Sequence, residues 1–330
     1  MAIEETARTA TLDLRGKRVW VAGHRGMVGS AVVRRLQREE CTILTARRDE
    51  LDLREQAATT RWIRRNRPDV AIIAAARVGG IMANAQYPVD FLYDNLMIGL
   101  NTMKACHDVG VERLLWLASS CIYPREAAQP ITEDALLTGP LEPTNEAYAI
   151  AKIAGLKLAE AYSRQHGKSF ITAMPTNLYG PNDNFDLNTS HVMPALIRKI
   201  HDAKMSGSST VTIWGTGRPI REFLHVDDLA DAAVFLTRNY DGREHVNIGS
   251  GREVSIGELA ALVARAVGFE GNFVFDTSKP DGTPRKGLET SKMERLGWKP
   301  SIRLEDGIAQ LYALWRQQLD VAERPLARAS

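Results

Sequence analysis

The sequence predicts an α/β fold: a doubly wound parallel sheet followed by a smaller C-terminal domain. Short apolar runs alternate with stretches of helical periodicity, which is typical of a parallel sheet covered by helices on both faces. A glycine-rich turn separates the first apolar run from the first helical pattern. After Pro181 the composition of the sequence changes, because Pro, Asn, Asp and Ser cluster up to residue 190.

Five apolar runs are the expected strands of the sheet. The first, KRVWVA, covers residues 17–22, and the others cover 41–45, 70–75, 114–118 and 170–174. The expected helix after the first strand carries Val28, Val32, Val33 and Leu36 on one face. In the second half, a helix over 192–204, a strand over 211–214 and helices over 226–238 and 255–267 are expected. The last of these begins at Ser255 with Glu258 three residues on, a capping-box pattern.

These elements suggest four parts of the chain. Residues 1–16 are expected to be a flexible extension, and 17–180 a dinucleotide-binding domain to which some later segments return. Residues 181–320 would mainly form a substrate-binding domain, and 321–330 a frayed tail.

Composition and charge favour a small-molecule partner. Lys and Arg number 42 against 40 Asp and Glu, and a net charge of +2 gives no reason to expect nucleic acid or a membrane. Three scattered cysteines are too few for a disulfide framework or a zinc site, so a reducing, cytoplasmic setting is expected. His225 and Asp227 have no further ligands nearby in the sequence, and no metal is expected.

The glycine turn has the spacing G-x-x-G-x-x-G and comprises Gly23, His24, Arg25, Gly26, Met27, Val28 and Gly29. Placed between a strand and a helix, it lets backbone N–H groups approach a pyrophosphate, as in Rossmann folds. A tight turn without a ligand is the alternative.

Residues that follow the second expected strand indicate which coenzyme is preferred. Arg48 stands where many NAD enzymes carry an acidic residue. With Arg25 it favours the 2′-phosphate of NADP, although Asp49 and Glu50 follow directly and both arginines could simply be solvated. Asp52 and Leu53 could border the adenine, and Ala75 ends the next strand at the edge where ligands bind.

Tyr148 and Lys152 lie four residues apart in YAIAK and project from one face of a helix. A lysine ammonium near a phenol favours the phenolate and lowers the phenol's pKa from about 10. Tyr148 is therefore expected to donate a proton to a carbonyl oxygen as hydride arrives. Ser119 follows the strand LLWLA and could hold that oxygen.

Long strings of the chain resemble the GDP-L-fucose synthase family of extended short-chain dehydrogenases/reductases, from residue 17 to about 310. They are GHRGMVGS, SSCIYP, EPTNEAYAIAKIAG, MPTNLYGPNDNF, HVMPALI, REFLHVDD and KPDGTPRK. The resemblance implies a homodimeric, NADP(H)-dependent enzyme that converts GDP-4-keto-6-deoxy-D-mannose to GDP-L-fucose by two epimerisations and a reduction. It also implies a dimer formed through helices near 90–107 and 147–165, where Phe91, Leu92, Met97 and Leu100 offer apolar surface.

The resemblance also implies site residues. The catalytic residues would be Ser119, Cys121, Tyr148, Lys152 and His191, with Cys121 and His191 as the epimerisation pair. Besides the glycine turn and Arg48, cofactor contacts fall on Leu117, Ala118, Ser119, Ser120, Lys152, Pro175, Thr176, Asn177, Leu178 and His191. Contacts to the GDP-sugar fall on Lys199, Trp214, Arg221 and Asp281.

Simpler interpretations exist for several of these residues. A cysteine after a buried strand is often structural, His191 could merely begin a helix, and Lys199 could be solvated. Trp214 and Arg221 bracket GTGRPI, which could close a hairpin.

Two other functions are consistent with the same scaffold. One is a nucleotide-sugar reductase with a single epimerisation, for instance on a 3,6-dideoxy sugar. The other is a dinucleotide-binding regulator without turnover, although such proteins commonly lack the tyrosine or the lysine.

Overall fold

The structure is a computed structural model that describes residues 11–323 except Asn188 and Pro280. Its centre is a six-stranded sheet in the order β2-β1-β3-β4-β5-β9, in which every pair of neighbours is parallel. The strands are β1 (Arg18–Ala22), β2 (Thr42–Leu44), β3 (Val70–Ile73), β4 (Arg113–Leu117), β5 (Ser169–Pro175) and β9 (Val246–Ile248). The predicted doubly wound parallel sheet is confirmed.

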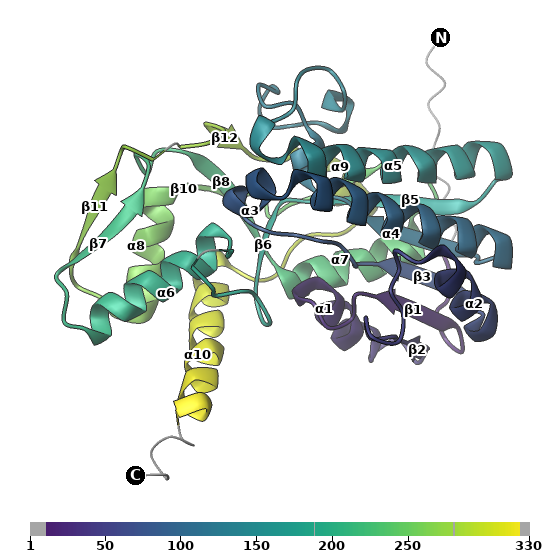
Figure 1. Ribbon diagram of the computed structural model, residues 1–330, viewed down its shortest axis with the longest axis horizontal. Coiled ribbons are helices and arrows are strands. Elements are labelled where there is room, and N and C mark those ends of the chain that lie inside the picture. Colours follow the sequence, from purple (N-terminus) through teal and green to yellow (C-terminus); the bar gives the residue numbers. More distant parts are fainter. Residues whose placement is uncertain (1–10, 188, 280, 324–330) are drawn as a thin grey trace.

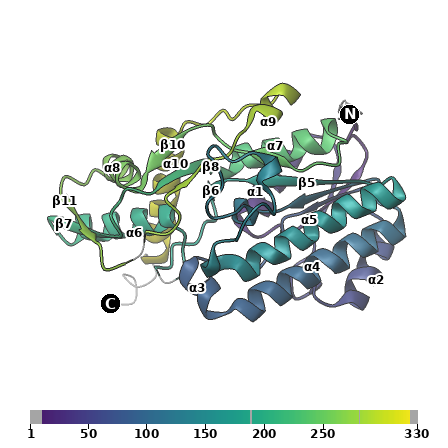
Figure 2. The same cartoon turned by 90° about the horizontal axis from the view of Figure 1, so that it is seen from above.

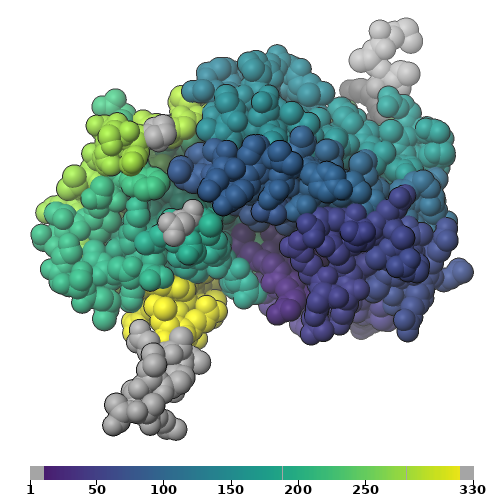
Figure 3. All heavy atoms as spheres, in the orientation of Figure 1, coloured from purple at the N-terminus to yellow at the C-terminus, as the bar shows by residue number. Residues whose placement is uncertain are grey.

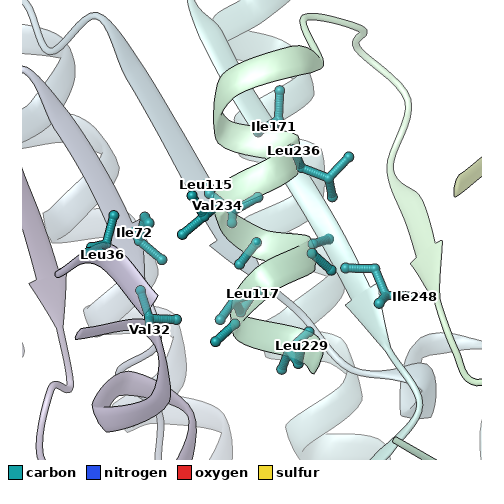
Figure 4. Close-up of a cluster of buried hydrophobic side chains, with 14 of the residues drawn as sticks. Val32, Leu36, Ile72, Leu115, Leu117, Ile171, Leu229, Val234, Leu236 and Ile248 are labelled. Carbon is teal, nitrogen blue, oxygen red and sulfur yellow. The ribbon is translucent and has the colours of Figure 1, made fainter. Parts of the chain in front are cut away.

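Helices cover both faces of this sheet (Figures 1 and 2). On one face α1 (Met27–Leu36) packs beside α7 (Val226–Asn239), and on the other α4 (Pro88–Val109) lies between α2 (Gln56–Asn66) and α5 (Glu146–His166). Figure 4 shows the first face, where apolar side chains from β3, β4, β5 and β9 meet those of α1 and α7. The later segments α7 and β9 thus belong to the first core, as does Met293 of α9 (Ser291–Leu296).

A second group of elements forms its own core beside the sheet. A four-stranded sheet contains β6 (Asn177–Tyr179), β8 (Ile220–His225), β10 (Glu253–Ser255) and β12 (Arg285–Lys286), and β7 (Thr210–Trp214) pairs with β11 (Asn272–Asp276). Their apolar faces pack against α6 (Val192–Met205), α8 (Ile256–Val267) and α10 (Leu304–Glu323). Figure 3 shows the purple and blue N-terminal residues on one side and most of the green residues on the other.

Several local expectations are confirmed. The helices and strands expected in the second half are present as α6, β7, α7 and α8. The Ser255 hydroxyl accepts from the Glu258 N–H and the Glu258 carboxylate accepts from the Ser255 N–H, so the capping box is formed. The segment GTGRPI closes no hairpin, because β7 pairs with β11 whereas β8 pairs with β6, β10 and β12.

The expected flexible ends need correction. Leu12 and Leu14 are buried in the first core, and the Leu12 N–H donates to the Arg238 carbonyl, so these two leucines anchor residues 11–16 to the domain. Burial of each leucine side chain stabilises the fold by roughly 1.5–3 kcal/mol. This stabilisation explains why the segment packs on the domain although its other residues are mostly polar. Helix α10 continues to Glu323, three residues into the expected tail. Residues 1–10 and 324–330 lie outside the described residues.

No helix within the described part of the chain is long and apolar enough to cross a membrane.

Candidate active site

The glycine turn joins β1 to α1 at the point where the strand order reverses between β1 and β3. Gly23 has φ +81°, and a Cβ there would lie 2.7 Å from the backbone of Ala75. A Cβ at Gly29 would overlap the Gly23 carbonyl oxygen. No side chain caps the N-terminus of α1, whose N-cap is Gly26. The turn therefore offers bare N–H groups at the crevice where dinucleotides bind in such sheets.

The other predicted cofactor contacts lie at the carboxyl ends of neighbouring strands. Ala75 follows β3, and residues 117–120 cover the end of β4 and the start of the 3₁₀ turn Ser120–Ile122. Residues 175–178 cover the end of β5 and the start of β6. Because these strands are parallel neighbours, their ends meet at one edge of the sheet, together with the glycine turn. In that turn the buried Nδ1 of His24 has no hydrogen-bond partner among the described residues, while Arg25 is exposed and Met27 and Val28 are half-buried.

The two arginines that follow β2 differ in their ion pairs. Arg47 forms ion pairs of 3.2 Å with both Asp49 and Glu50. Arg48 is exposed and, among the described residues, has no ion pair. Both acidic residues that weakened the prediction of NADP are thus already paired with Arg47.

Asp52 and Leu53, predicted to border the adenine, lie in the turn before α2 and are half-buried. The Asp52 carboxylate accepts from the Arg54 guanidinium at 2.6 Å. This contact lowers the pKa of Asp52.

Helix α5 carries Tyr148 and Lys152 toward the end of β4. The Lys152 ammonium is buried, donates to the Leu117 carbonyl at 2.9 Å, and lies 5.7 Å from the centre of the Tyr148 ring. The Lys152 ammonium also lies 4.3 Å from the centre of the Trp116 ring. Since an ammonium has three donors, Lys152 keeps donors for a ligand. Ser119 contributes a hydrogen bond at the Tyr148 hydroxyl.

The protein groups around Tyr148 raise its pKa, so the expected lowering is wrong for the protein without a ligand. Burial raises the pKa of Tyr148 above its usual range, negative charge on Cys121 raises it further, and the hydrogen bond with Ser119 offsets only part. Burial also lowers the pKa of Lys152 to about 7. Desolvation disfavours both charged forms, an effect that spacing in the sequence does not reveal. Tyr148 is therefore held as a protonated phenol, the form that a proton donor needs.

Cys121 lies in the 3₁₀ turn after β4, two residues from Ser119. Its backbone N–H donates to the Ser119 hydroxyl at 3.4 Å. Its half-buried Sγ accepts from the side-chain amide of Asn145 at 3.3 Å and from the Lys286 ammonium at 3.6 Å. The sulfur thus contacts two polar groups, whereas the side chain of Cys106 is fully buried.

His191 is the residue before α6, as the simpler interpretation also had it. Part of the residue is solvent-accessible, yet enough protein surrounds the imidazole for burial to lower its pKa.

The four predicted substrate contacts come from the second group of elements. Lys199 on α6 places its ammonium 4.9 Å from the centre of the exposed Trp214 ring, and burial lowers its pKa. Arg221 on β8 uses one donor on the Ile220 carbonyl, at 2.8 Å. Asp281 fixes the turn after β7, since its carboxylate accepts from the N–H and hydroxyl of Thr216 at 2.6 and 2.8 Å.

Comparison with known proteins decides the family. The model of the NAD dependent epimerase/dehydratase family matches residues 19–249. The chain belongs to this family. A GDP-L-fucose synthase from Sinorhizobium fredii is 57% identical over 299 residues, which cover 91% of this chain and 95% of that protein. A GDP-L-colitose synthase from Yersinia pseudotuberculosis is 39% identical over 295 residues, or 89% and 96% of the two chains.

A solved structure shares the fold. The GDP-L-fucose synthetase from Naegleria fowleri bound to NADP superimposes with a TM-score of 0.87 at 30% identity, covering 95% of this chain and 98% of that one. The chain is thus an enzyme of the GDP-L-fucose synthase group within the NAD dependent epimerase/dehydratases, a family that uses a nicotinamide cofactor.

Two contacts of this family member were not predicted from the sequence, those of Asn145 and Lys286 with Cys121. Both residues lie inside strings that carry the resemblance, EPTNEAYAIAKIAG and KPDGTPRK. They are separated from Cys121 by 24 and 165 residues, so only the fold reveals that they meet.

His225 and Asp227 are explained by capping: His225 Nδ1 accepts the Asp227 N–H at 3.2 Å, at the start of α7. Among the described residues, no group of three or more His, Cys, Asp or Glu side chains could hold a metal ion.

Proposed function

We propose that the chain converts GDP-4-keto-6-deoxy-D-mannose to GDP-L-fucose with NADPH, by epimerisation at C3 and C5 followed by reduction at C4. The observation that carries this proposal is that Cys121 and Tyr148 share one site, because the Cys121 N–H donates to the Ser119 hydroxyl at 3.4 Å and Ser119 also forms a hydrogen bond with the Tyr148 hydroxyl. A plain ketoreductase needs only the tyrosine and its lysine. A thiol beside them supplies the base that epimerisation also requires.

Reduction would be centred on Tyr148. When bound, NADPH supplies the hydride that reaches C4 of the sugar. Tyr148, kept protonated by burial, donates its proton to the oxygen at C4, which Ser119 also holds. Lys152, fixed on the Leu117 carbonyl, would supply donors for the nicotinamide ribose, and its charged form is favoured as Tyr148 loses its proton, because the developing phenolate offsets the effect of burial.

Epimerisation would use Cys121 and His191. Both C3 and C5 flank the C4 ketone, so their protons become acidic once Tyr148 and Ser119 stabilise the enolate. Cys121 as thiolate removes the proton, and protonated His191 returns one to the opposite face. The lowered pKa of His191 makes its imidazolium a stronger acid. Exchange of protons with solvent restores both groups before the second inversion.

The substrate diphosphate would be bound by Lys199 and Arg221. Both are cations with lowered pKa values because of burial, and a diphosphate compensates such desolvated charge well. Asp281 would act by holding the turn beside Trp214.

The proposal is tested by incubating the enzyme with GDP-4-keto-6-deoxy-D-mannose and NADPH. We expect NADPH oxidation that depends on the sugar and a product that co-elutes with GDP-L-fucose. A GDP-L-colitose synthase shares the family, so the rival with one epimerisation is tested on a substrate without the C3 hydroxyl. Faster turnover of that substrate would favour the rival, and binding of NADPH without turnover of either sugar would favour the regulator.

NADPH is the proposed coenzyme because Arg48 and Arg25 are exposed at the glycine turn and the end of β2, without ion pairs among the described residues. Arg48→Ala should raise the KM for NADPH roughly tenfold, or about 1.4 kcal/mol, because a charge-assisted contact to the 2′-phosphate is lost. The KM for NADH should change less than about twofold. Arg47→Ala is the matched control, since Arg47 is already paired with Asp49 and Glu50. An equal change for both coenzymes in Arg48→Ala would contradict the assignment.

A homodimer is proposed through α4 and α5, which correspond to the helices expected near 90–107 and 147–165. The expectation for Phe91 is wrong: Phe91 is 3% exposed and packs edge-on against Tyr148, so it offers no surface for a partner. Leu92 and Met97 are half-buried, and Leu100 is exposed. Exposed apolar residues that sequence reasoning did not name add to this surface; they are Val89, Tyr93 and Ile150.

Sedimentation at micromolar concentration should therefore give about twice the chain mass of 36.5 kDa. Tyr93→Glu should shift the protein toward monomers, because a charge would be desolvated in the interface. Met205→Glu, an exposed apolar position on α6, serves as control and should remain dimeric. A monomeric wild type would contradict the proposal.

A further inference from the structure

The sulfur of Cys121 accepts from two donors that reach it from distant parts of the chain. Lys286 on β12 approaches within 3.6 Å, and Asn145, which precedes α5, within 3.3 Å. We propose that Lys286 and Asn145 are positioning residues that hold Cys121 as a thiolate, Lys286 by its charge and Asn145 by one amide N–H. Only the catalytic consequence of this inference rests on the proposed function.

The backbone beside Lys286 is fixed on both sides. Lys286 pairs with Arg221 in the β12–β8 register. The next N–H, of Gly287, donates to the Gln129 side chain at 3.0 Å, and that of Leu288 donates to the Glu222 carboxylate at 2.9 Å. Glu222 is itself only 1% exposed. Strand pairing and two backbone hydrogen bonds therefore hold the segment that carries Lys286 beside Cys121.

The surrounding charges leave Lys286 available for the sulfur. A cavity beside Cys121 is lined by charged groups from several elements. Arg125 pairs with Glu142 at 3.5 Å, and Arg285 pairs with Glu253 at 2.6 Å. Successive strand residues point to opposite sides, so Arg285 faces Glu253 while Lys286 faces the sulfur. Among the described residues, no carboxylate lies within ion-pair distance of Lys286.

Asn145 adds a second, directional contact. Its Nδ2 donates to the sulfur, while its Oδ1 is buried without a partner among the described residues. This amide orientation leaves an acceptor unsatisfied, which is unfavourable unless the N–H gains a strong acceptor in exchange. A thiolate is such an acceptor, because hydrogen bonds to charged groups are stronger than neutral ones.

Negative charge on Cys121 raises the pKa of Tyr148, which lies on α5. Because two neighbouring anions disfavour each other, a Cys121 thiolate keeps Tyr148 protonated. The arrangement thus assigns the negative charge to the cysteine and the proton to the tyrosine, as epimerisation before reduction requires.

The test is the pH dependence of Cys121 alkylation by iodoacetamide in the ligand-free full-length enzyme, followed by peptide mass spectrometry, because only the thiolate reacts. Lys286→Met should slow alkylation at pH 7 roughly tenfold and move the profile up by about one pH unit. Lys286→Arg keeps the positive charge, so its alkylation rate should stay within about twofold of the wild-type rate. Asn145→Ala should give a smaller shift in the same direction. Lys299→Met, at an exposed lysine paired with Glu294, is the matched control and should match wild type.

A Lys286→Met profile identical to that of wild type would overturn the proposal. Lys286→Gln, which keeps a polar side chain without the charge, should give the same slowing if Lys286→Met fails to fold. An alkylation profile that responds to Lys286 in an enzyme that makes no GDP-L-fucose would separate this inference from the proposed function. In that case the thiolate assignment stands and the proposed reaction fails.

Discussion

Tyr148→Phe should slow hydride transfer by about 10²–10⁴-fold, the usual contribution of a positioned proton donor. Burial raises the pKa of Tyr148, so the phenol keeps its proton until the oxygen at C4 becomes negative. Only one hydroxyl is removed, and the contact of Lys152 with the Leu117 carbonyl is independent of it. The fold and the affinity for NADPH should therefore be unchanged.

The measurement for this variant is single-turnover oxidation of NADPH, with coenzyme binding followed by fluorescence. Tyr162→Phe is the matched control, because Tyr162 lies on the same helix α5 and packs among His107, His166 and Phe170. Turnover of Tyr148→Phe within about twofold of wild type would place the proton donor elsewhere.

Cys121→Ser and His191→Asn should each suppress hydrogen exchange at C3 and C5 in deuterated water, by at least about a hundredfold. Serine keeps the size of the side chain, but it is a far weaker base than a thiolate. Asparagine keeps hydrogen bonding at position 191 without a proton that titrates near neutrality. Reduction in either variant should then act on the unepimerised ketone, if at all.

NMR of the recovered GDP-sugar follows this exchange at each carbon. Cys41→Ser is the control, because Cys41 donates to the Leu36 carbonyl at 3.7 Å and lies outside the candidate site. Exchange at both carbons at the wild-type rate in Cys121→Ser would show that another residue is the base.

Local patterns in the sequence were sufficient for five of the six strands of the central sheet and for the glycine turn, whereas the short edge strand β9 was not among the expected strands. Apolar runs in β1 to β5 and the spacing of Gly23, Gly26 and Gly29 depend on neighbouring residues only, as does the capping box at Ser255. The burial of Leu12 and Phe91 could not be predicted in this way. The burial of each side chain depends on which distant segment of the chain covers it, and the periodicity of the local sequence does not reveal that segment.

The electrostatics of the site needed the structure for the same reason. The spacing of Tyr148 and Lys152 indicates proximity, but their pKa values follow from the burial that surrounding elements impose. The approach of Lys286 to Cys121 depends on β12 pairing with β8. Asn145 and Lys286 lie in separate parts of the sequence, and only the fold brings both to the Cys121 sulfur.

The most direct test of the proposed reaction is NMR of the product formed in deuterated water from GDP-4-keto-6-deoxy-D-mannose and NADPH. We expect GDP-L-fucose with deuterium at C3 and C5, because Cys121 and His191 exchange their protons with solvent. We also expect protium at C4, because that hydrogen comes from the coenzyme as hydride. A product with protium at C3 or C5, or one reduced at C4 with both neighbouring centres unchanged, would contradict the proposed reaction.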